Sequence, residues 1–336
     1  MRVLQAPSEI AGQTSILARA LRDIGVEAWS LATNPTFAQY SVDEMQSYDD
    51  MRAVPRYLGY AGNLVRHAGQ WDVFHFHFGR TLIPPHNPDA PLYHLLGKKV
   101  VYHYHGCDVR NRAHMLATHT RSTCTECDPF CLPKRQKRIL AEAERHADAE
   151  IVSTPDLLES APKAQHIPVA AWLADYVVQP VREIPKLVLH APTNRLIKGT
   201  RFVEAAFEQL RPRFPGVEFL TIEKRPWSEL QKLIAECDVF VDQTLMGWYG
   251  MVSVEAMAMG KPSLSYIRED FESRLHDCPL VRTSCESLAD DLAALLRDAP
   301  RRRQIAAESR AYVEREHDAH AIANRLVHLY QSLGVA

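Results

Sequence analysis

The chain has 336 residues, and its 39 Lys and Arg nearly balance its 41 Asp and Glu, which gives a formal net charge of −2. This balance supplies no bulk field to attract nucleic acid or an anionic membrane, and no apolar run reaches the length of a transmembrane segment. The length exceeds that of one ordinary domain, and seven cysteines without a disulfide-like pattern suit a reducing compartment, so we expect two α/β domains in a soluble cytoplasmic protein.

The first part of the chain alternates short apolar runs with helical patterns. A short run over residues 2–5, with Val3 and Leu4 at its centre, precedes a glycine turn at Gly12, which opens a helical pattern. Residues 71–79 alternate strictly, which predicts a strand with His75 and His77 on one face and aromatic residues on the other. We interpret the two histidines as buried core residues that lie near a site at best.

A second buried strand, predicted over residues 98–104, ends at His105. Ligands of open α/β sheets gather outside the carboxyl ends of the strands, which makes His105 a candidate site residue. Its imidazole can donate a hydrogen bond to a ligand hydroxyl or a phosphate oxygen. Asp108 follows closely and either orients His105 or caps the turn.

Four cysteines group around the next polar loop, namely Cys107, Cys124, Cys127 and Cys131. The Cys-x-x-Cys pair is typical of structural zinc, which takes four thiolate or imidazole ligands, and His114 or His119 are alternatives for the fourth position. One interpretation is therefore a structural zinc that pins the loop. The other is a set of reduced cysteines without metal, or a single redox pair.

A proline-rich stretch near residue 180 predicts the boundary between domains 1–175 and 186–315. Strands alternate with helices through the second domain, which indicates a parallel sheet. A loop after its first strand carries two cations, Arg195 and Lys198. The chain ends in helical patterns, the last over residues 318–334.

The next stretch predicts an anion-binding site. An apolar strand over residues 238–242 leads to two glycines, Gly247 and Gly250, and then to a helix over 252–259. A glycine turn before a helix N-terminus offers unpaired N–H groups and a positive dipole end to an anion. We expect Glu255 in the first turn of this helix. A phosphate site beside a carboxylate that can bind sugar hydroxyls is the chemistry of a bound nucleotide.

Two segments of this stretch carry a family resemblance. Gly247-Trp248-Tyr249-Gly250 and Glu255-Ala256-Met257-Ala258-Met259-Gly260-Lys261-Pro262 resemble the nucleotide-sugar signature of retaining glycosyltransferases of family 4, which have the GT-B fold. The resemblance implies two Rossmann-like domains whose parallel sheets face a central cleft, with the last helix packing back on the first domain. It implies transfer of a sugar from a UDP- or GDP-sugar to a hydroxyl of a glycan, lipid-linked or small-molecule acceptor, with retention of anomeric configuration.

The resemblance also assigns roles to residues. The catalytic candidates are His105, Arg195 and Lys198, and the nucleotide-sugar candidates are Gly12, Asp108, Asn194, Gly250, Met251, Val252 and Glu255. In the family, an arginine and a lysine clamp the donor diphosphate, and a glutamate at the position of Glu255 binds the ribose hydroxyls. The leaving phosphate is thought to help deprotonate the acceptor, so the chemistry requires no cofactor and no separate base.

One position departs from the family pattern. Family members commonly carry a first glutamate eight residues before the second, and this chain has Gly247 there. Contacts with the donor sugar must then come from elsewhere, with Asp242 and Gln243 as candidates. Two alternatives stay open, a nucleotide-sugar 2-epimerase and a catalytically inactive binding subunit. We expect a cytoplasmic location, with the inner face of the membrane as a second site of action.

Overall fold

The computed structural model describes residues 1–48, 50–127 and 131–335. The chain forms two compact units. The first comprises Met1–Asn111, Leu132–Ala170 and Ala319–Ala336, and the second comprises Arg112–Cys131 and Ala171–Asp318. The structure thus groups Arg112–Cys131 with the second unit, although this segment lies within the sequence range assigned to the first domain.

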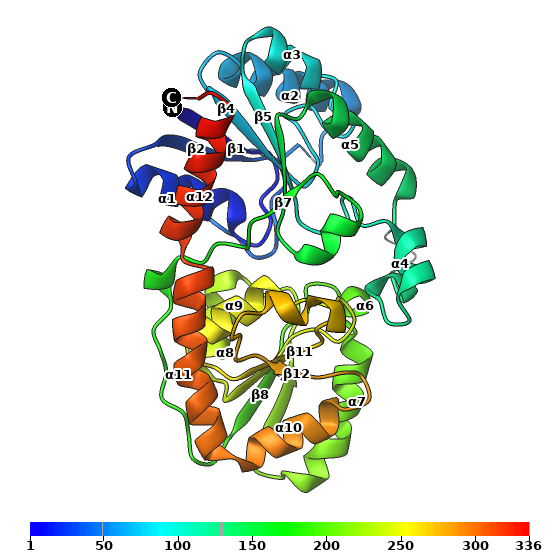
Figure 1. The fold of residues 1–336 in the computed structure, drawn as a ribbon, viewed down its shortest axis with the longest axis vertical. Coiled ribbons are helices and arrows are strands. Elements are labelled where there is room, and N and C mark those ends of the chain that lie inside the picture. Colours follow the sequence, from blue (N-terminus) through cyan, green and yellow to red (C-terminus); the bar gives the residue numbers. More distant parts are fainter. Residues whose placement is uncertain (49, 128–130, 336) are drawn as a thin grey trace. The chain divides into compact units, whose positions relative to one another are not determined.

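A seven-stranded parallel sheet forms the centre of the first unit, in the order β3-β2-β1-β4-β5-β6-β7 (Figure 1). Its strands are β1 (Arg2–Ala6), β2 (Glu27–Ala32), β3 (Glu44–Met45), β4 (Val73–His77), β5 (Lys99–Tyr104), β6 (Ala149–Val152) and β7 (Gln165–His166). All five residues of β4 are buried, because the strand lies in the middle of the sheet and both of its faces are covered.

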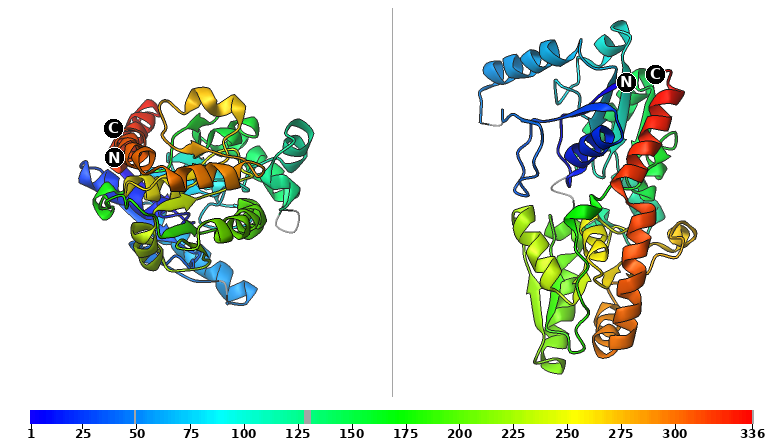
Figure 2. Two further views of the ribbon diagram at one scale, coloured as in Figure 1. Left: turned by 90° about the horizontal axis from the view of Figure 1, so that it is seen from below. Right: turned by 90° about the vertical axis from the view of Figure 1, so that its left-hand side faces the viewer.

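The helices of the first unit include one from the end of the chain. They are α1 (Gln13–Asp23), α2 (Ala53–His67), α3 (Ala90–Leu95), α5 (Pro133–His146) and α12 (Ala319–Ser332). Helix α12 packs against α1, and the two ends of the chain lie side by side (Figures 1 and 2). The apolar stripe of α12 is buried at Ile322, Leu326 and Leu329, as its helical spacing predicts.

The second unit has a five-stranded parallel sheet in the order β12-β11-β10-β8-β9. Its strands are β8 (Leu187–His190), β9 (Glu218–Thr221), β10 (Val239–Val241), β11 (Ser263–Ser265) and β12 (Val281–Arg282). Its helices are α4 (Arg112–Thr118), α6 (Arg195–Lys198), α7 (Thr200–Leu210), α8 (Trp227–Glu236), α9 (Met251–Ala258), α10 (Leu288–Arg297) and α11 (Ala299–Glu316). An aliphatic and aromatic core between sheet and helices includes Val188, Phe207 and Leu292.

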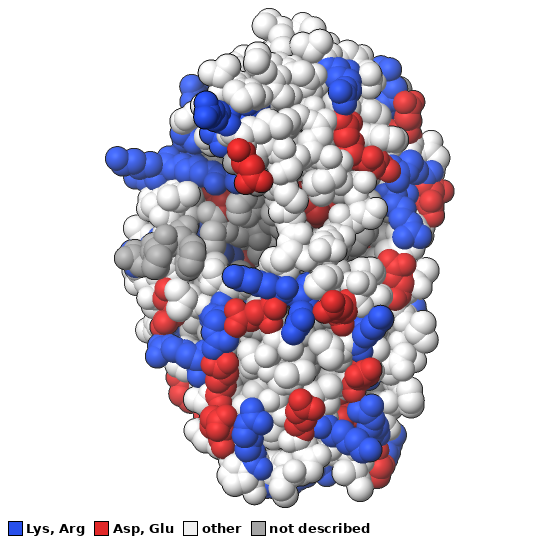
Figure 3. Space-filling view, turned by 180° about the vertical axis from the view of Figure 1, so that it is seen from behind, with Lys and Arg blue, Asp and Glu red and all other residues white. Residues whose placement is uncertain are grey.

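Short 3₁₀ segments complete the secondary structure. They are Thr123–Thr125, Pro155–Glu159, Leu173–Asp175, Arg211–Arg213 and Glu269–Arg274. Two purely parallel sheets with helices confirm the predicted α/β fold class. On the face drawn in Figure 3, Lys and Arg are interspersed with Asp and Glu, in keeping with the near-zero net charge. Among the described residues, no helix has both the length and the apolar character that a bilayer span requires.

Candidate functional site

The loop after β8 carries the two predicted cations on a single helical turn. Asn194 begins α6, because its side-chain oxygen accepts hydrogen bonds from the backbone N–H groups of Leu196 and Ile197 at 3.0 and 3.2 Å. Arg195 lies on the outside of this turn and forms ion pairs with Glu204 and Glu223. The capping amide of Asn194 therefore holds the backbone from which both cations extend.

Lys198 lies on the inner side of the same turn and is largely buried. Its Nζ is 3.0 Å from Asp242 Oδ1, and its side chain is 12% exposed. Asp242 follows β10 and is itself buried. Its second oxygen accepts hydrogen bonds from the backbone N–H of Gly250 at 2.7 Å and from the hydroxyl of Ser253 at 2.8 Å. A single carboxylate thus connects Lys198 with the first turn of α9.

The Asp242 carboxylate binds the backbone N–H of Gly250, a group that the sequence analysis predicts to bind a phosphate. The N–H of Gly250 donates to Asp242 in the structure, so this amide already binds an anion supplied by the chain itself. A Cβ at this position would lie 2.7 Å from Lys198 Nζ, so a larger residue here would displace the ammonium group of Lys198. Met251 and Val252 form the start of α9, which begins one residue before the predicted helix.

Glu255 lies deeper in α9 than predicted. The helix begins at Met251, so Glu255 is its fifth residue and not part of the first turn, which has no acidic residue. The expected first-turn position, where the helix dipole would favour a negative charge, is therefore wrong. Burial instead raises its pKa to about 7, because the charged form is desolvated.

Two aromatic residues that the sequence did not indicate bind Glu255. Its Oε1 accepts hydrogen bonds from Trp227 Nε1 at 3.0 Å and from the Tyr176 hydroxyl at 3.2 Å. Its Oε2 is buried and has no hydrogen-bond partner among the described residues. A buried carboxylate oxygen without a donor is costly, so Glu255 is suited to accept a hydrogen bond from a ligand.

The segment before α9 places Gly247 and Gln243 close together. Gly247 has a positive φ of 78°, and its carbonyl accepts the N–H of Arg268 at 3.0 Å. The side-chain amide of Gln243 donates to the carbonyl of Trp248, and its Oε1 is buried without a partner among the described residues. Both carboxylate oxygens of Asp242 already bind Lys198 or the first turn of α9. Of the two candidates for a sugar contact, Gln243 is therefore the one with an oxygen that can still accept a hydrogen bond.

In the first unit, Gly12 lies in a loop held by a buried carboxylate. Gly12 has a φ of 80°, a left-handed conformation that favours glycine, and it immediately precedes α1. The side chain of Glu9 accepts the backbone N–H of Ser15 at 3.1 Å and therefore caps the first turn of α1. Burial raises the pKa of Glu9 to about 7.

His105 has no ring nitrogen available to a ligand in this structure. Its Nδ1 lies 2.6 Å from the hydroxyl of Ser153, and its Nε2 lies 2.9 Å from His77 Nδ1. Burial lowers its pKa to about 3, so the imidazole is neutral. Asp108 caps the turn, because its carboxylate accepts the backbone N–H groups of His105 and Gly106. Burial also raises the pKa of Asp108 to about 6.

The four cysteines do not form a metal-binding cluster among the described residues. Cys107 belongs to the first unit, whereas Cys124, Cys127 and Cys131 belong to the second. Cys124 and Cys127 are buried and pack with Met115, with Ile197 of the cation-bearing turn against them. The zinc interpretation therefore stays a prediction, while the structure shows the Cys-x-x-Cys pair as part of a small apolar cluster.

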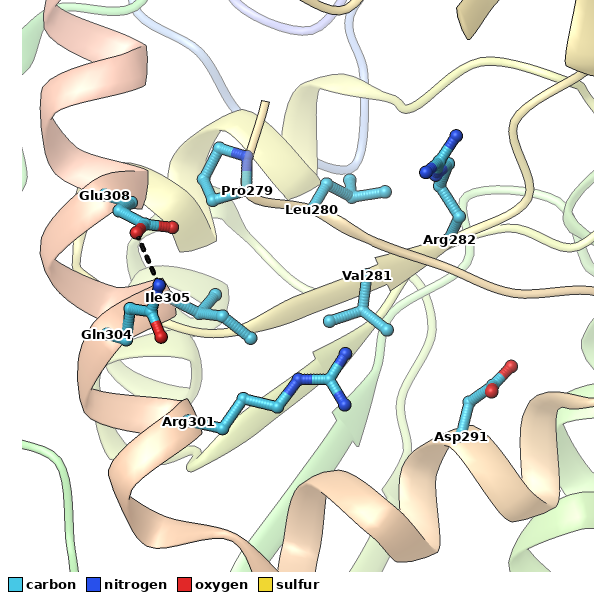
Figure 4. Close-up of a pocket in the computed structure, with 9 residues that line it drawn as sticks. All are labelled: Pro279, Leu280, Val281, Arg282, Asp291, Arg301, Gln304, Ile305 and Glu308. Atoms are coloured by element: carbon cyan, nitrogen blue, oxygen red, sulfur yellow. Dashed lines mark hydrogen bonds between the residues drawn. The ribbon is translucent and has the colours of Figure 1, made fainter. Parts of the chain in front are cut away.

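A pocket in the second unit lies apart from the predicted residues. It has a volume of about 350 Å³ and is lined by nine residues, from the segment just before β12 and from β12, α10 and α11 (Figure 4). The charged side chains at its rim are Arg282, Asp291, Arg301 and Glu308, and Gln304 donates to Glu308 at 2.9 Å. None of the predicted site residues lines this pocket, so we do not place the nucleotide there.

Comparisons with known proteins identify the fold. No family model and no curated protein matches the sequence. The structure is similar to sucrose-phosphate synthase from Thermosynechococcus elongatus, with a TM-score of 0.70 and 14% identity over 99% of each chain. It is also similar to Anabaena HepE in complex with UDP-glucose, with a TM-score of 0.62 and 16% identity over 99% of this chain and 100% of HepE.

A third similar structure is S. aureus MnaA with UDP, with a TM-score of 0.59 and 13% identity over 100% of this chain and 98% of MnaA. The chain has the GT-B fold. The predicted architecture of two Rossmann-like units with parallel sheets is therefore confirmed. At these identities the comparisons establish the fold, and the activity has to be argued from the residues.

Proposed function

We propose that this GT-B protein is a glycosyltransferase that moves a sugar from a nucleotide-sugar donor to an acceptor hydroxyl with retention of anomeric configuration. The observation that carries this proposal is the buried Oε2 of Glu255, which has no hydrogen-bond partner in the part of the chain that the structure describes. It lies on the helix that follows the glycine turn, as a ribose-binding carboxylate would. The occurrence of UDP and UDP-glucose in structures with the same fold supports the choice of ligand.

In this proposal, the second unit binds the nucleotide. The ribose hydroxyls donate to Glu255, and Lys198 and Arg195 bind the diphosphate. Charge builds up on the outer phosphate as the glycosidic bond breaks, and fixed cations stabilise that charge in a site with little water. Lys198 is held by Asp242 in the structure, so an incoming phosphate competes with this carboxylate for the ammonium group.

The remaining chemistry needs few groups from the protein. The leaving phosphate accepts the proton of the acceptor hydroxyl, so we assign no side chain as general base and no cofactor to the reaction. The acceptor is a glycan, a lipid-linked sugar or a small molecule. His105, whose nitrogens are both bonded, contributes a neutral surface and not an acid or a base.

The zinc proposal is separate from the chemistry. Metal analysis of the purified protein is expected to find one zinc per chain that is lost in Cys124→Ser, because thiolates are the preferred ligands of structural zinc. A metal-free wild-type protein would overturn it.

The activity is tested with a panel of UDP- and GDP-sugars, each incubated with candidate acceptors. Proton NMR of the product is expected to show the anomeric configuration of the donor retained. Conversion of the donor without acceptor into its 2-epimer would instead establish the epimerase alternative. Tight nucleotide binding with no turnover of any donor would identify a binding subunit. This alternative stays open because Gly247 replaces the first glutamate of the family pattern.

We further infer that the protein works in the cytoplasm and binds the membrane surface through α2. This helix lies at the edge of the first unit (Figure 2, light blue). Val54, Leu58 and Val65 are 71%, 67% and 83% exposed, and their spacing places them on one face. The helix has no acidic residue, and Arg52 and Arg56 lie at its start, which suits an anionic bilayer, whereas Arg66 near its end is paired with Glu44.

Sedimentation with lipid vesicles tests this inference. The protein is expected to bind vesicles that contain phosphatidylglycerol and not vesicles of phosphatidylcholine alone. The double variant Val54→Ser/Leu58→Ser should lose this binding, whereas Leu95→Ser, which changes an equally exposed apolar residue on α3, should keep it. Equal binding by both variants would contradict a role for α2.

A further inference from the structure

Seven polar side chains of the first unit close a ring of hydrogen bonds. They come from β1, β4, β5, the ends of β5 and β6, and α12, and are Gln5, His75, His77, His103, His105, Ser153 and Tyr330. Around the ring the distances are Tyr330 Oη–His75 Nδ1 2.6 Å, His75 Nε2–His103 Nδ1 3.1 Å, His103 Nε2–Ser153 Oγ 3.2 Å, Ser153 Oγ–His105 Nδ1 2.6 Å, His105 Nε2–His77 Nδ1 2.9 Å, His77 Nε2–Gln5 Oε1 2.8 Å and Gln5 Nε2–Tyr330 Oη 3.3 Å. Every member except His105 is almost fully buried.

Gln5 sets the direction of these hydrogen bonds. Its Oε1 can only accept, so His77 must carry its proton on Nε2 and accept at Nδ1. Its Nε2 can only donate, so the Tyr330 hydroxyl receives that bond and gives its own proton to His75. Both sides of the ring therefore start from one amide.

The same reasoning then fixes each imidazole in turn. His105 donates from Nε2 to His77, and its Nδ1 accepts from the Ser153 hydroxyl. The Ser153 hydroxyl has two acceptors in reach, His105 Nδ1 at 2.6 Å and the Tyr104 carbonyl at 3.0 Å, and its proton goes to the nearer one, because an Nδ1 without a proton can only accept. His75 donates from Nε2 to His103, and His103 donates from Nε2 to Ser153. All four histidines are thus neutral Nε2–H tautomers.

The closed ring also decides against a metal at this place. His75, His77 and His103 each offer a nitrogen within 4.8 Å of the others, a grouping that suits a metal ion. A metal needs free lone pairs, and each ring nitrogen here already has a hydrogen-bond partner. Binding an ion would break at least three of these bonds in a buried site that contributes no negative charge to the group.

The ring holds its histidines uncharged. Burial lowers the pKa of His75 and of His105 to about 3, and it lowers the pKa of His77 and of His103 well below the usual value. The neighbouring ionisable groups are His166 on β7, which acts on His103, and Asp108, whose carboxylate faces the backbone N–H of His105. The Asp108 carboxylate accepts the backbone N–H groups of His105 and Gly106.

We propose that Gln5 and Tyr330 are positioning residues, which fix His105 as the neutral Nε2–H tautomer through the hydrogen-bonded ring. The inference rests on the proposed function, in which His105 contributes a neutral surface and not an acid or a base. Gln5 and Tyr330 belong to opposite ends of the chain, and the proton order that they impose reaches His105 through His77 on one side and through Ser153 on the other. A neutral imidazole with both nitrogens engaged cannot take a proton from an acceptor or compete with the leaving phosphate for one.

Gln5→Glu tests the proton order directly. A carboxylate accepts from both His77 and Tyr330, which takes the Tyr330 proton away from His75. The order of the remaining bonds then reverses, His105 becomes an Nδ1–H tautomer, and His77, which now donates from both nitrogens, becomes an imidazolium. Nitrogen-15 chemical shifts of labelled histidines, measured without substrate, are expected to show four neutral Nε2–H rings in the wild type from pH 6 to 8 and this rearrangement in Gln5→Glu.

Two further variants keep the test independent of folding. Tyr330→Phe removes one hydroxyl and lets the amide of Gln5 rotate, so His105 is expected to show a mixture of tautomers. Tyr312→Phe is the matched control, because its buried hydroxyl is hydrogen-bonded to Tyr249 in the second unit and should leave the histidine signals unchanged.

Kinetics separate a positioning role from a structural one. In Gln5→Glu, kcat is expected to fall at least about tenfold, with KM for the donor little changed and a new ionisation near neutral pH in the rate profile. Wild-type ring histidines that titrate near pH 6.5, unchanged tautomers in Gln5→Glu, or zinc held by His75 and His103 would each overturn the inference. Absence of turnover in the wild type would instead contradict the proposed function and leave the NMR result standing.

Discussion

Two buried side chains of the candidate site, Glu255 and Gln243, each have one oxygen without a hydrogen-bond donor among the described residues. Glu255 has one oxygen held by Trp227 and Tyr176 and the other without a donor among the described residues. A hydrogen bond to a charged group contributes about 1.5–3 kcal/mol, so this oxygen is a strong acceptor when the carboxylate is ionised. Its raised pKa makes that strength depend on pH close to neutrality.

We predict that donor binding by the wild type strengthens as the pH rises through about 7, because only the ionised Glu255 accepts hydrogen bonds from two ribose hydroxyls at once. Calorimetric titration of the nucleotide sugar between pH 6 and 8.5 measures this. Glu255→Gln should bind about 10–100-fold more weakly at pH 8 and lose the pH dependence. An unchanged pH profile in the variant would show that Glu255 does not contact the ligand.

Glu255 should affect folding stability in the opposite direction to donor binding. As the pH rises, we expect donor binding to strengthen and the folding stability of the wild type to fall relative to Glu255→Gln. Since the folded pKa of Glu255 lies above the usual 4.5, the folded protein retains a proton between pH 4.5 and 7 that the unfolded chain releases. This group therefore makes the wild type less stable as the pH rises through that window. Urea unfolding should show Glu255→Gln gaining stability relative to the wild type from pH 5 to pH 8, and a constant difference would contradict the raised pKa.

At the scale of elements, Asp242 connects the loop after β8 with the start of α9. Its carboxylate accepts from the Gly250 N–H and from Ser253, and it pairs with the ammonium of Lys198. Sequence patterns located both elements, because glycine turns, apolar strands and helical spacing are local signals. They did not indicate the bridge, since an aspartate at a strand end has no pattern that distinguishes it from a solvent-exposed one.

Asp242→Ala is therefore expected to destabilise the second unit. The change leaves the largely buried Lys198 without its counter-ion and the first turn of α9 without its acceptor, and loss of one member of a buried ion pair costs about 3–5 kcal/mol. Equilibrium denaturation measures the loss. Ser253→Ala, which removes only one donor to the same carboxylate, should cost about 1 kcal/mol. Equal effects of the two variants would show that the Lys198 pair contributes nothing.

The whole molecule shows how far local patterns reach. Apolar runs and helical spacing predict most strands and helices of both units to within a few residues. They do so because burial of one face of a helix, or of both faces of a strand, imposes a regular spacing on the apolar residues. The membership of Arg112–Cys131 in the second unit and the ring that joins Gln5 with Tyr330 depend on contacts between residues distant in sequence. His75 and His77 are buried, as predicted, and their hydrogen-bond partners are side chains from β1, from β5 and its end, and from α12.

We propose that the second unit binds a nucleotide sugar and that Arg195 binds its diphosphate. Calorimetric titration of the wild-type protein and of Arg195→Ala with UDP- and GDP-sugars is the most direct measurement of this. Arg195 is 44% exposed and ion-paired, so its replacement should leave the fold intact, and Arg303→Ala, a similarly exposed and paired residue on α11, is the matched control. We predict that one nucleotide sugar binds the wild type and the control equally, and that Arg195→Ala binds it at least about tenfold more weakly. Failure of every nucleotide sugar to bind, or equal affinity in all three proteins, would contradict the account.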